Sequence, residues 1–323
     1  MIVTLTPNPS LDRSMEVSHL ERGAVLRSSR ALVHAGGKGI NVVQALAANG
    51  VTAAAVLPIG GPEGAQLLDL LTADGIQFRT TPIAGTIRAN ISIVEPDGTV
   101  TKINEPGPHL TDDEVGLLLT ATADAATGAA WVVACGSLPD GAPVDLYARI
   151  VEQAHEAGAR VAVDTSGAPL LACLPAGPDL IKPNADELAA AAGTHITTLG
   201  DVVAAADALR TLGAGAVLAS LGADGAVLLT DSVRLHATCP VDRPVSAVGA
   251  GDAALAGYLT GATPAEGLRA AVAFGAAAVQ LPGSALPGPA DIDLAAVRVT
   301  EAIDHDVPLT ERNQTDDARL RVR

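Results

Sequence analysis

The chain has 323 residues, enough for one large α/β domain with a small appendage or for two modest domains. Hydrophobic residues make up 48% of it and aromatic residues only 2%, so a core must be built from Ala, Val, Leu and Ile. A formal net charge of −16 argues against nucleic acid as a partner, and apolar runs such as residues 129–134 stop well short of the roughly 20 residues that span a membrane.

The first third of the chain combines short strands with helices that end at glycine. Gly50 ends one such helix in the position that glycine favours, and Pro96-Asp97-Gly98 is a strong hairpin signal. In chain order we expect strands at 2–6, 14–17 and 31–34, a helix at 40–49, a strand at 53–57, a helix at 65–74, and hairpin strands at 86–95 and 99–103.

From about residue 111 onward, strand and helix patterns alternate. The expected elements are a helix at 111–126, a strand at 130–135, a helix at 143–157, strands at 160–164 and 179–181, helices at 185–192 and 200–212, strands at 215–220 and 227–230, and helices at 249–259 and 268–279. This alternation predicts a mostly parallel sheet with helices on both faces.

The pattern divides the chain into an α/β core and a small β-sheet that we expect to act as a lid. The core is expected to comprise residues 1–9, 36–83 and 106–310, and the discontinuous lid residues 10–35 and 84–105. Residues 311–323 lack periodicity, so we expect them to form a flexible tail.

The cysteines and the N-terminal segment indicate a cytoplasmic protein. Cys135, Cys173 and Cys239 are odd in number, far apart in the sequence and without C-x-x-C spacing, which argues against a disulfide framework or a zinc site. No basic segment followed by an apolar one opens the sequence, so we expect no secretory leader.

The strongest local signal for chemistry is Gly249-Ala250-Gly251-Asp252, in which glycines precede a helix and a carboxylate follows one step inside it. Free backbone N–H groups at a helix N-terminus form an anion hole that can hold a developing phosphoryl charge, and Asp252 can accept a proton from a hydroxyl beside it. By itself the motif is weak evidence for catalysis, because glycine often precedes a helix that has no catalytic role.

A second glycine-rich segment, Gly36-Gly37-Lys38-Gly39-Ile40-Asn41, also precedes a helix. It is neither a Walker A loop nor a dinucleotide-binding loop. Its glycines allow close approach of the backbone to a ligand, while Lys38 and Asn41 supply a cation and an amide. The first 38 residues carry five basic residues against three acidic ones, a net +2 in an otherwise acidic chain.

Two further motifs follow predicted strands. Lys182-Pro183-Asn184-Ala185-Asp186-Glu187 lies at the carboxyl end of a strand, where open parallel sheets bind ligands, and it also fits an ordinary helix start capped by Asn184 and Glu187. Ser220-Leu221-Gly222-Ala223-Asp224-Gly225 leaves the next strand and fits an ordinary glycine turn equally well.

Taken together and in this order, the four motifs resemble the PfkB (ribokinase-like) family of carbohydrate kinases. The resemblance reaches to about residue 295. Thr4-x-x-Pro7-Asn8-Pro9-Ser10-Leu11-Asp12, residues 101–107 and Gly136-Ser137-Leu138-Pro139 look most like its hexose-phosphate branch. The resemblance implies a ribokinase-like three-layer core, a β lid that closes the sugar site, and a homodimer paired through that lid.

The resemblance also implies roles for individual residues. Sugar hydroxyls would be held by Asp12, Gly37 and Asn41, beside Gly36. The phosphate already on the substrate would be held by Lys38, Arg88 and Ser137, with Arg27 reaching across from a partner subunit. ATP would be bound by Lys182, Asn184, Ser220, Gly222 and Gly225. Mg²⁺ would be positioned through water by Asn184 and Glu187.

The implied reaction is ATP-dependent phosphorylation of fructose 1-phosphate at its 6-hydroxyl, with Asp252 as the general base. Tagatose 6-phosphate and fructose 6-phosphate are alternative substrates, because the same cations serve a phosphate at C1 or at C6. A non-catalytic regulator that binds nucleotides or sugar phosphates is an alternative of another class. Ala247 stands where relatives often carry Thr or Ser, so one nucleotide-side hydroxyl is missing.

Overall fold

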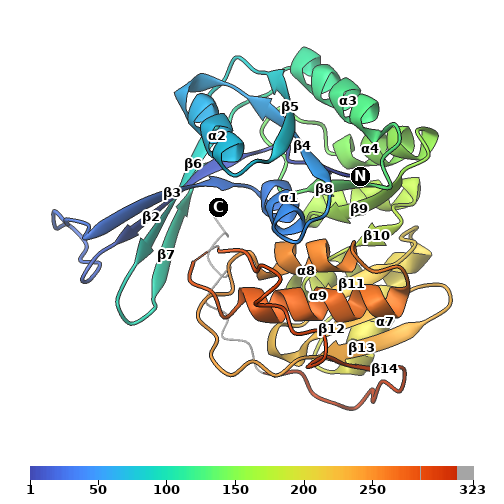
Figure 1. Ribbon diagram of the computed structural model, residues 1–323. Coiled ribbons are helices and arrows are strands. Elements are labelled where there is room, and N and C mark those ends of the chain that lie inside the picture. Colours follow the sequence, from blue (N-terminus) through green and yellow to red (C-terminus); the bar gives the residue numbers. More distant parts are fainter. Residues whose placement is uncertain (284, 311–323) are drawn as a thin grey trace.

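The computed structural model describes residues 1–283 and 285–310, so the tail expected at 311–323 lies outside the described residues. The described chain forms a large sheet covered by helices on both faces and a smaller sheet that projects from one side of it (Figure 1). This is the α/β architecture that the alternating pattern predicts.

Ten strands of the described residues form the large sheet, in the order β14-β13-β12-β11-β10-β9-β8-β1-β4-β5. Their bounds are β1 Ile2–Leu5, β4 Ala53–Ile59, β5 Gln77–Pro82, β8 Trp131–Cys135, β9 Arg160–Asp164, β10 Leu180–Ile181, β11 Val217–Ser220, β12 Ala226–Leu229, β13 Arg234–Thr238 and β14 Arg298–Thr300. All neighbouring pairs from β5 to β11 are parallel, and β11 to β14 pair antiparallel. The predicted mostly parallel sheet is confirmed.

The helices form the two outer layers. Their bounds are α1 Lys38–Ala48, α2 Gly61–Ala73, α3 Asp112–Ala126, α4 Leu146–Glu156, α5 Gly167–Cys173, α6 Ala185–Ala192, α7 Leu199–Thr211, α8 Ala250–Tyr258 and α9 Pro264–Ala278. On one face of the sheet α1 contacts α8 and α8 contacts α9, while α3 to α7 follow one another across the other face (Figure 1). Within the described ranges no helix combines the length and the apolar character needed to cross a lipid bilayer.

The smaller sheet has the order β3-β2-β6-β7, with β2 Ser10–Glu16, β3 Arg30–Gly36, β6 Arg88–Val94 and β7 Val100–Asn104. Because side chains alternate along a strand, its two faces differ. Asp12 and Asn90 share the polar face, whereas Met15, Ile91 and Ile103 belong to the opposite, apolar face. Helix α2 contacts β2 and β3 and so connects this sheet to the core.

Within the described residues, three strands and one α-helix were not predicted. The strands β5, β13 and β14 lie at or near the edges of the large sheet and carry polar residues, such as Arg79 and His236, that hide the strand pattern. Helix α5 has only seven residues, too few to show a helical period. The predicted helix at 268–279 in fact begins earlier, at Pro264, because Thr263 and Glu266 form a capping box there.

Helix α8, which carries Asp252, packs closely against α9 because Gly257 has no side chain. A Cβ at Gly257 would lie 2.5 Å from the backbone oxygen of Ala270, closer than real Cβ atoms approach. A Cβ at Gly275, in α9, would meet Ala250 and Ala254 atoms at 3.6 Å, which is ordinary contact. Gly257 therefore sets the spacing of the two helices.

We expect Gly257→Ala to lower the free energy of unfolding by about 1–3 kcal/mol, the usual cost of overpacking a core. Gly275→Ala is the matched control and should be neutral or stabilise the protein by about 0.5–1 kcal/mol, since Ala favours a helix more than Gly does. Urea denaturation of the two variants measures both changes. Equal stability of the two variants would contradict this account of the helix spacing.

Candidate active site

Most of the predicted functional residues lie where the parallel strands of the large sheet end, beside Asp164, which was not predicted. Asp164 is the last residue of β9, Lys182 directly follows β10, and Ser220 ends β11. Helix α8 begins beside them, since a Cβ at Gly251 would lie only 3.3 Å from the Lys182 Nζ atom. Open parallel sheets bind ligands at this edge.

Asp252 lies in the first turn of α8, and only 7% of it is exposed. The helix can begin there because Gly249 adopts a φ of 79°, in the left-handed region. The Asn41 Nδ2 atom donates a hydrogen bond of 2.7 Å to the Asp252 Oδ2 atom. Burial, together with the nearby charge of Asp164, raises the pKa of Asp252 to about 6, which suits a base that works near neutral pH.

Asp164 is a fully buried carboxylate that bridges two lysines. The Lys38 Nζ atom donates a hydrogen bond of 2.8 Å to its Oδ1 atom, and the Lys182 Nζ atom lies 3.1 Å from its Oδ2 atom. Burial alone would raise the pKa of Asp164, but the two ammonium groups outweigh it and hold the pKa below its usual value. Asp164 therefore stays ionised and fixes both lysines.

Lys38 also lies near Glu187, with 3.8 Å between its Nζ atom and the Glu187 Oε1 atom. Burial alone would lower the pKa of Lys38, yet the charges of Asp164 and Glu187 raise it above its ordinary value. Lys38 is thus held as a cation, about one third exposed, at the start of α1. An ammonium group in this position can bind an anionic ligand.

Sequence reasoning missed Asp164, although a signal was available. Asp164 follows the apolar run Val161 to Val163 directly, so it is a carboxylate at the exit of a buried strand. The same logic selected Lys182. Asp164 was overlooked because no glycine-rich motif surrounds it.

On the side of the small sheet, Asp12 lies directly over Gly36. A Cβ at Gly36 would overlap the Asp12 carboxylate, so only glycine leaves room for it. The Arg88 Nη1 atom donates a hydrogen bond of 3.2 Å to the Glu105 backbone oxygen. Burial lowers the pKa of Arg88, while the charges of Asp12 and Glu105 oppose that shift. These contacts place Arg88 at the base of the small sheet.

Ser137 follows β8 and lies beside Asn8, which the sequence did not single out as a site residue. The Asn8 Nδ2 atom donates hydrogen bonds of 3.4 Å to the Ser137 Oγ atom and 3.0 Å to the Pro106 backbone oxygen. A Cβ at Gly107 would overlap the Asn8 side chain. Asn8 therefore ties the Pro-Asn-Pro turn to the two segments where Ser137 and Gly107 lie.

The Asn184 segment forms the capping box that its sequence also allowed. The Asn184 Oδ1 atom accepts from the Glu187 N–H (2.8 Å), and the Glu187 Oε2 atom accepts from the Asn184 N–H (2.9 Å). Asn184 also bridges to Ser220 on the neighbouring strand. Gly222 begins a single 3₁₀ turn, and Gly225, with a φ of 82°, packs where a Cβ would overlap the Ala237 oxygen.

Arg27 is the one predicted site residue that the described chain does not bring to this region. It lies in the exposed connection between β2 and β3, and it has no hydrogen bond or ion pair to any described residue. Figure 1 shows this end of the small sheet projecting away from the large one. The role expected for Arg27, holding the phosphate of the substrate from a partner subunit, stays a prediction.

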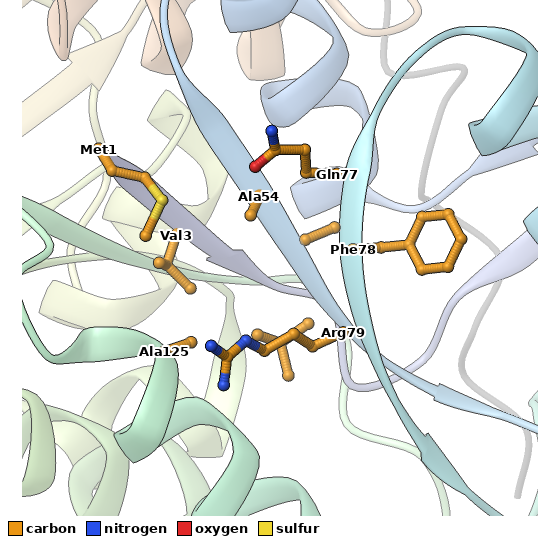
Figure 2. Close-up of a pocket in the computed structure, with 9 residues that line it drawn as sticks. Met1, Val3, Ala54, Gln77, Phe78, Arg79 and Ala125 are labelled. Atoms are coloured by element: carbon orange, nitrogen blue, oxygen red, sulfur yellow. The ribbon is translucent and has the colours of Figure 1, made fainter.

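A cavity of about 160 Å³ lies elsewhere, between the large sheet and α3 (Figure 2). Met1, Val3 and Ala125 contribute to its lining, the Arg79 guanidinium reaches toward Ala125, and the Phe78 ring points away. Met1 marks the amino end of β1, and the lining includes no carboxylate. This cavity is therefore separate from the candidate active site.

A parallel sheet whose strand exits gather a buried carboxylate, two lysines and a helix N-terminus suits phosphoryl transfer, which depends on positioning and electrostatic stabilisation. A model of the pfkB family of carbohydrate kinases matches residues 6–290. The chain belongs to the pfkB family of carbohydrate kinases, as the motifs predicted.

Individual relatives agree with this assignment. The chain is 37% identical over 305 residues to a protein of Rhodobacter capsulatus named 1-phosphofructokinase, covering 93% of this chain and 96% of that one. The crystal structure of phosphofructokinase-2 from Escherichia coli in complex with fructose-6-phosphate superposes with a TM-score of 0.84, at 31% identity, over 90% of this chain and 96% of that one.

The ribokinase-like fold is confirmed by a more distant structure. Arabidopsis thaliana ribokinase complexed with ribose and ATP superposes with a TM-score of 0.72 over 90% of this chain and 96% of that chain, at 21% identity. At this identity the likeness establishes the fold alone.

We expect Asp164→Asn to lower the free energy of unfolding by about 3–5 kcal/mol, because it leaves two lysines without their buried counter-charge. The Michaelis constants for both kinase substrates should rise as well, since both lysines lose their anchor. Urea denaturation and steady-state kinetics measure the two effects.

Asp207→Asn is the matched control, because Asp207 pairs at 3.0 Å with Arg234 on the surface. Such an exposed pair contributes about 0–1 kcal/mol. If Asp164→Asn destabilised the protein no more than Asp207→Asn does, the buried bridge would not have the structural role that we assign to it.

Proposed function

We propose that the protein transfers the γ-phosphoryl group of ATP to the 6-hydroxyl of fructose 1-phosphate and releases fructose 1,6-bisphosphate and ADP. The observation that carries this proposal is Asp252, a buried carboxyl group in the first turn of α8, near Lys182, whose pKa burial raises to about 6. Relatives named 1-phosphofructokinase support the choice of sugar. Tagatose 6-phosphate and fructose 6-phosphate are the alternatives.

In the proposed reaction Asp252 removes the proton of the 6-hydroxyl as the hydroxyl oxygen bonds to the γ-phosphorus. The bond from that phosphorus to the β–γ bridging oxygen breaks, and the electron pair leaves with ADP. The N–H groups of Gly249, Ala250 and Gly251 act as the anion hole for the transferring phosphoryl group, and the Ala250 N–H gives up its 3.3 Å hydrogen bond to the Ala247 oxygen to do so. Lys182 lies close enough to this turn to add a positive charge.

The sugar phosphate would lie between the small sheet and the start of α1. Its hydroxyls would contact Asp12, Gly36, Gly37 and Asn41, and its existing phosphate would contact Lys38, Arg88, Ser137 and the partner subunit's Arg27. Lys38 supports this placement because its pKa is raised and it is held as a cation. The few cations of an acidic chain are thereby concentrated at one anionic ligand.

The nucleotide would lie along the exits of β10 and β11, against Lys182, Asn184, Ser220, Gly222 and Gly225. Mg²⁺ keeps most of its waters and needs only one or two carboxylates plus phosphates. The Glu187 Oε1 atom would meet this demand through water, since the capping box uses only the Oε2 atom and the one ion partner of Oε1 among the described residues, Lys38, lies 3.8 Å away. When bound, Mg²⁺ would neutralise phosphate charge. The free cysteines suit a reducing cytoplasm.

The test of the proposal is an ADP-release assay with Mg-ATP and fructose 1-phosphate, fructose 6-phosphate or tagatose 6-phosphate, run in parallel. We expect the highest kcat/KM with fructose 1-phosphate. Turnover of the two 6-phosphates alone would overturn the proposed substrate and keep the kinase. No ADP release with any of the three sugar phosphates would favour another sugar as substrate or the non-catalytic regulator.

The Asp252→Asn variant distinguishes the hypothesis of a catalytic kinase from that of a non-catalytic regulator. We expect turnover to fall by roughly 10²–10⁴-fold, the usual contribution of a positioned base, with sugar-phosphate binding largely unchanged. In the native enzyme kcat/KM should fall about tenfold per unit as the pH drops below about 6, because Asp252 must be unprotonated to act. Unchanged turnover in the variant would remove Asp252 from the mechanism.

We further propose that two copies of the chain pair through the apolar faces of their small sheets. Ile103 lies on this face and is 55% exposed, and Met15, Ile91 and Ile93 alternate with the polar face on the neighbouring strands. Pairing would cover these side chains. Pairing would also bring the exposed Arg27 of one subunit toward the proposed phosphate site of the other subunit, because the Arg27 of that subunit's own chain lies far from the site.

We expect Ile103→Lys to shift the protein from dimer to monomer at micromolar concentration, as measured by size-exclusion chromatography with light scattering. Leu117→Lys is the matched control, because Leu117 is 49% exposed but lies on α3 of the core. The control should leave the molar mass unchanged. A native protein that is monomeric, or a dimer that survives Ile103→Lys, would contradict the proposed interface.

A further inference from the structure

One oxygen of the Asp12 carboxylate is already committed to hydrogen bonds within the small sheet. The Asp12 Oδ1 atom accepts from the Ser10 Oγ atom at 2.8 Å and from the Asn90 Nδ2 atom at 2.9 Å. Among the described residues no hydrogen bond engages the Oδ2 atom in the same way. Asp12 therefore has one fixed oxygen and one oxygen left for a ligand.

Asn90 occupies its position because of strand register. Strands β2 and β6 run parallel, with Asp12 opposite Asn90 and Ser10 opposite Arg88. The Asn90 Nδ2 atom also donates to the Ser10 Oγ atom at 3.0 Å, so Ser10, Asp12 and Asn90 form a closed set of three hydrogen bonds. The Asn90 Oδ1 atom is buried without a partner in the described chain.

The position of the Asp12 carboxylate is also restricted by Gly36 of β3. Gly36 is the β3 residue that pairs with Ser10 of β2, and it lies so close to Asp12 that a Cβ on Gly36 would overlap the Asp12 carboxyl atoms. Asn90 and Ser10 hold one oxygen while Gly36 limits the tilt of the whole group. The free oxygen is therefore held in one direction, and a rigid acceptor discriminates between hydroxyl geometries better than a mobile one.

We propose that Asn90 is a positioning residue that sets the specificity of the sugar site. By fixing the Asp12 Oδ1 atom, it orients the Oδ2 atom toward the ring hydroxyls and lets the site distinguish ketose phosphates that are epimers at C4. This inference rests on the proposed function, since it requires a sugar phosphate beside Asp12. It adds a residue of β6 to the determinants of substrate choice.

The test compares native protein, Asn90→Ala and Asn104→Ala with fructose 1-phosphate and its C4 epimer, tagatose 1-phosphate. We expect Asn90→Ala to raise the KM for fructose 1-phosphate about tenfold and to reduce the preference between the epimers by a similar factor, while the KM for ATP stays within about twofold. Asn104, the neighbour of Asn90 on exposed β7, is the matched control, and its variant should behave as the native protein does.

An Asp12→Asn background supplies a second readout. If Asn90 acts through Asp12, the effects of Asn90→Ala and Asp12→Asn on kcat/KM are not additive, whereas a general disturbance of the small sheet adds to the loss. Additive effects, an unchanged epimer preference, or equal losses of affinity for ATP and sugar would each overturn the proposal.

If the proposed function itself is wrong, the kinetic results differ from those that would overturn the role of Asn90. If the native enzyme accepts only 6-phosphates, fructose 6-phosphate and tagatose 6-phosphate are also C4 epimers and replace the first pair. If no turnover occurs, titration calorimetry of the same epimers with native protein and Asn90→Ala compares their dissociation constants. Epimer binding that Asn90→Ala leaves unaltered overturns the inference, and a reduced difference between the epimers supports it.

Discussion

The buried ion pairs of Asp164 with Lys38 and Lys182 hold the candidate active site together. Lys38 comes from the start of α1 and Lys182 from the exit of β10, so a single carboxylate connects segments 144 positions apart in the chain (182 − 38). Removing Asp164 would leave both lysines without their buried counter-charge, which is far costlier than losing a surface ion pair. In the proposed reaction one lysine faces the sugar phosphate and the other the nucleotide, so Asp164 sets the distance between the two reactants.

The backbone makes this arrangement possible at a few glycines. Gly36 leaves room for the Asp12 carboxylate, Gly251 leaves room for the Lys182 ammonium, and Gly257 lets α8 lie close to α9. In each case a Cβ would meet a group of the site or the helix that carries Asp252. The glycine-rich motifs therefore do more than supply free N–H groups, because they also set the approach of charged side chains from other segments.

The sequence predicted the parallel sheet and most helices because apolar periodicity is strong in buried elements. It missed the polar edge strands β5, β13 and β14, where partner strands rather than periodicity determine the structure. It predicted Asp252, Lys38 and Lys182 as site residues from their positions at strand exits and helix starts, and the structure places them near one another. It could not give the contacts among them, and it missed Asp164, because such contacts depend on how distant segments pack.

The contrast between Asp164 and Asp252 shows why residue type alone does not assign a base. Both are buried aspartates at the same edge of the sheet, and the charge of Asp164 contributes to the raised pKa of Asp252. Two lysines hold the pKa of Asp164 low, whereas Asp252 receives one amide hydrogen bond from Asn41, and burial raises its pKa to about 6. When the surroundings lower the pKa of one carboxyl group and raise that of another, the first stays ionised as a counter-ion and the second is suited to accept a proton. Because Asp164 remains charged, it also raises the pKa of Asp252, as the proposed role of Asp252 as a proton acceptor requires.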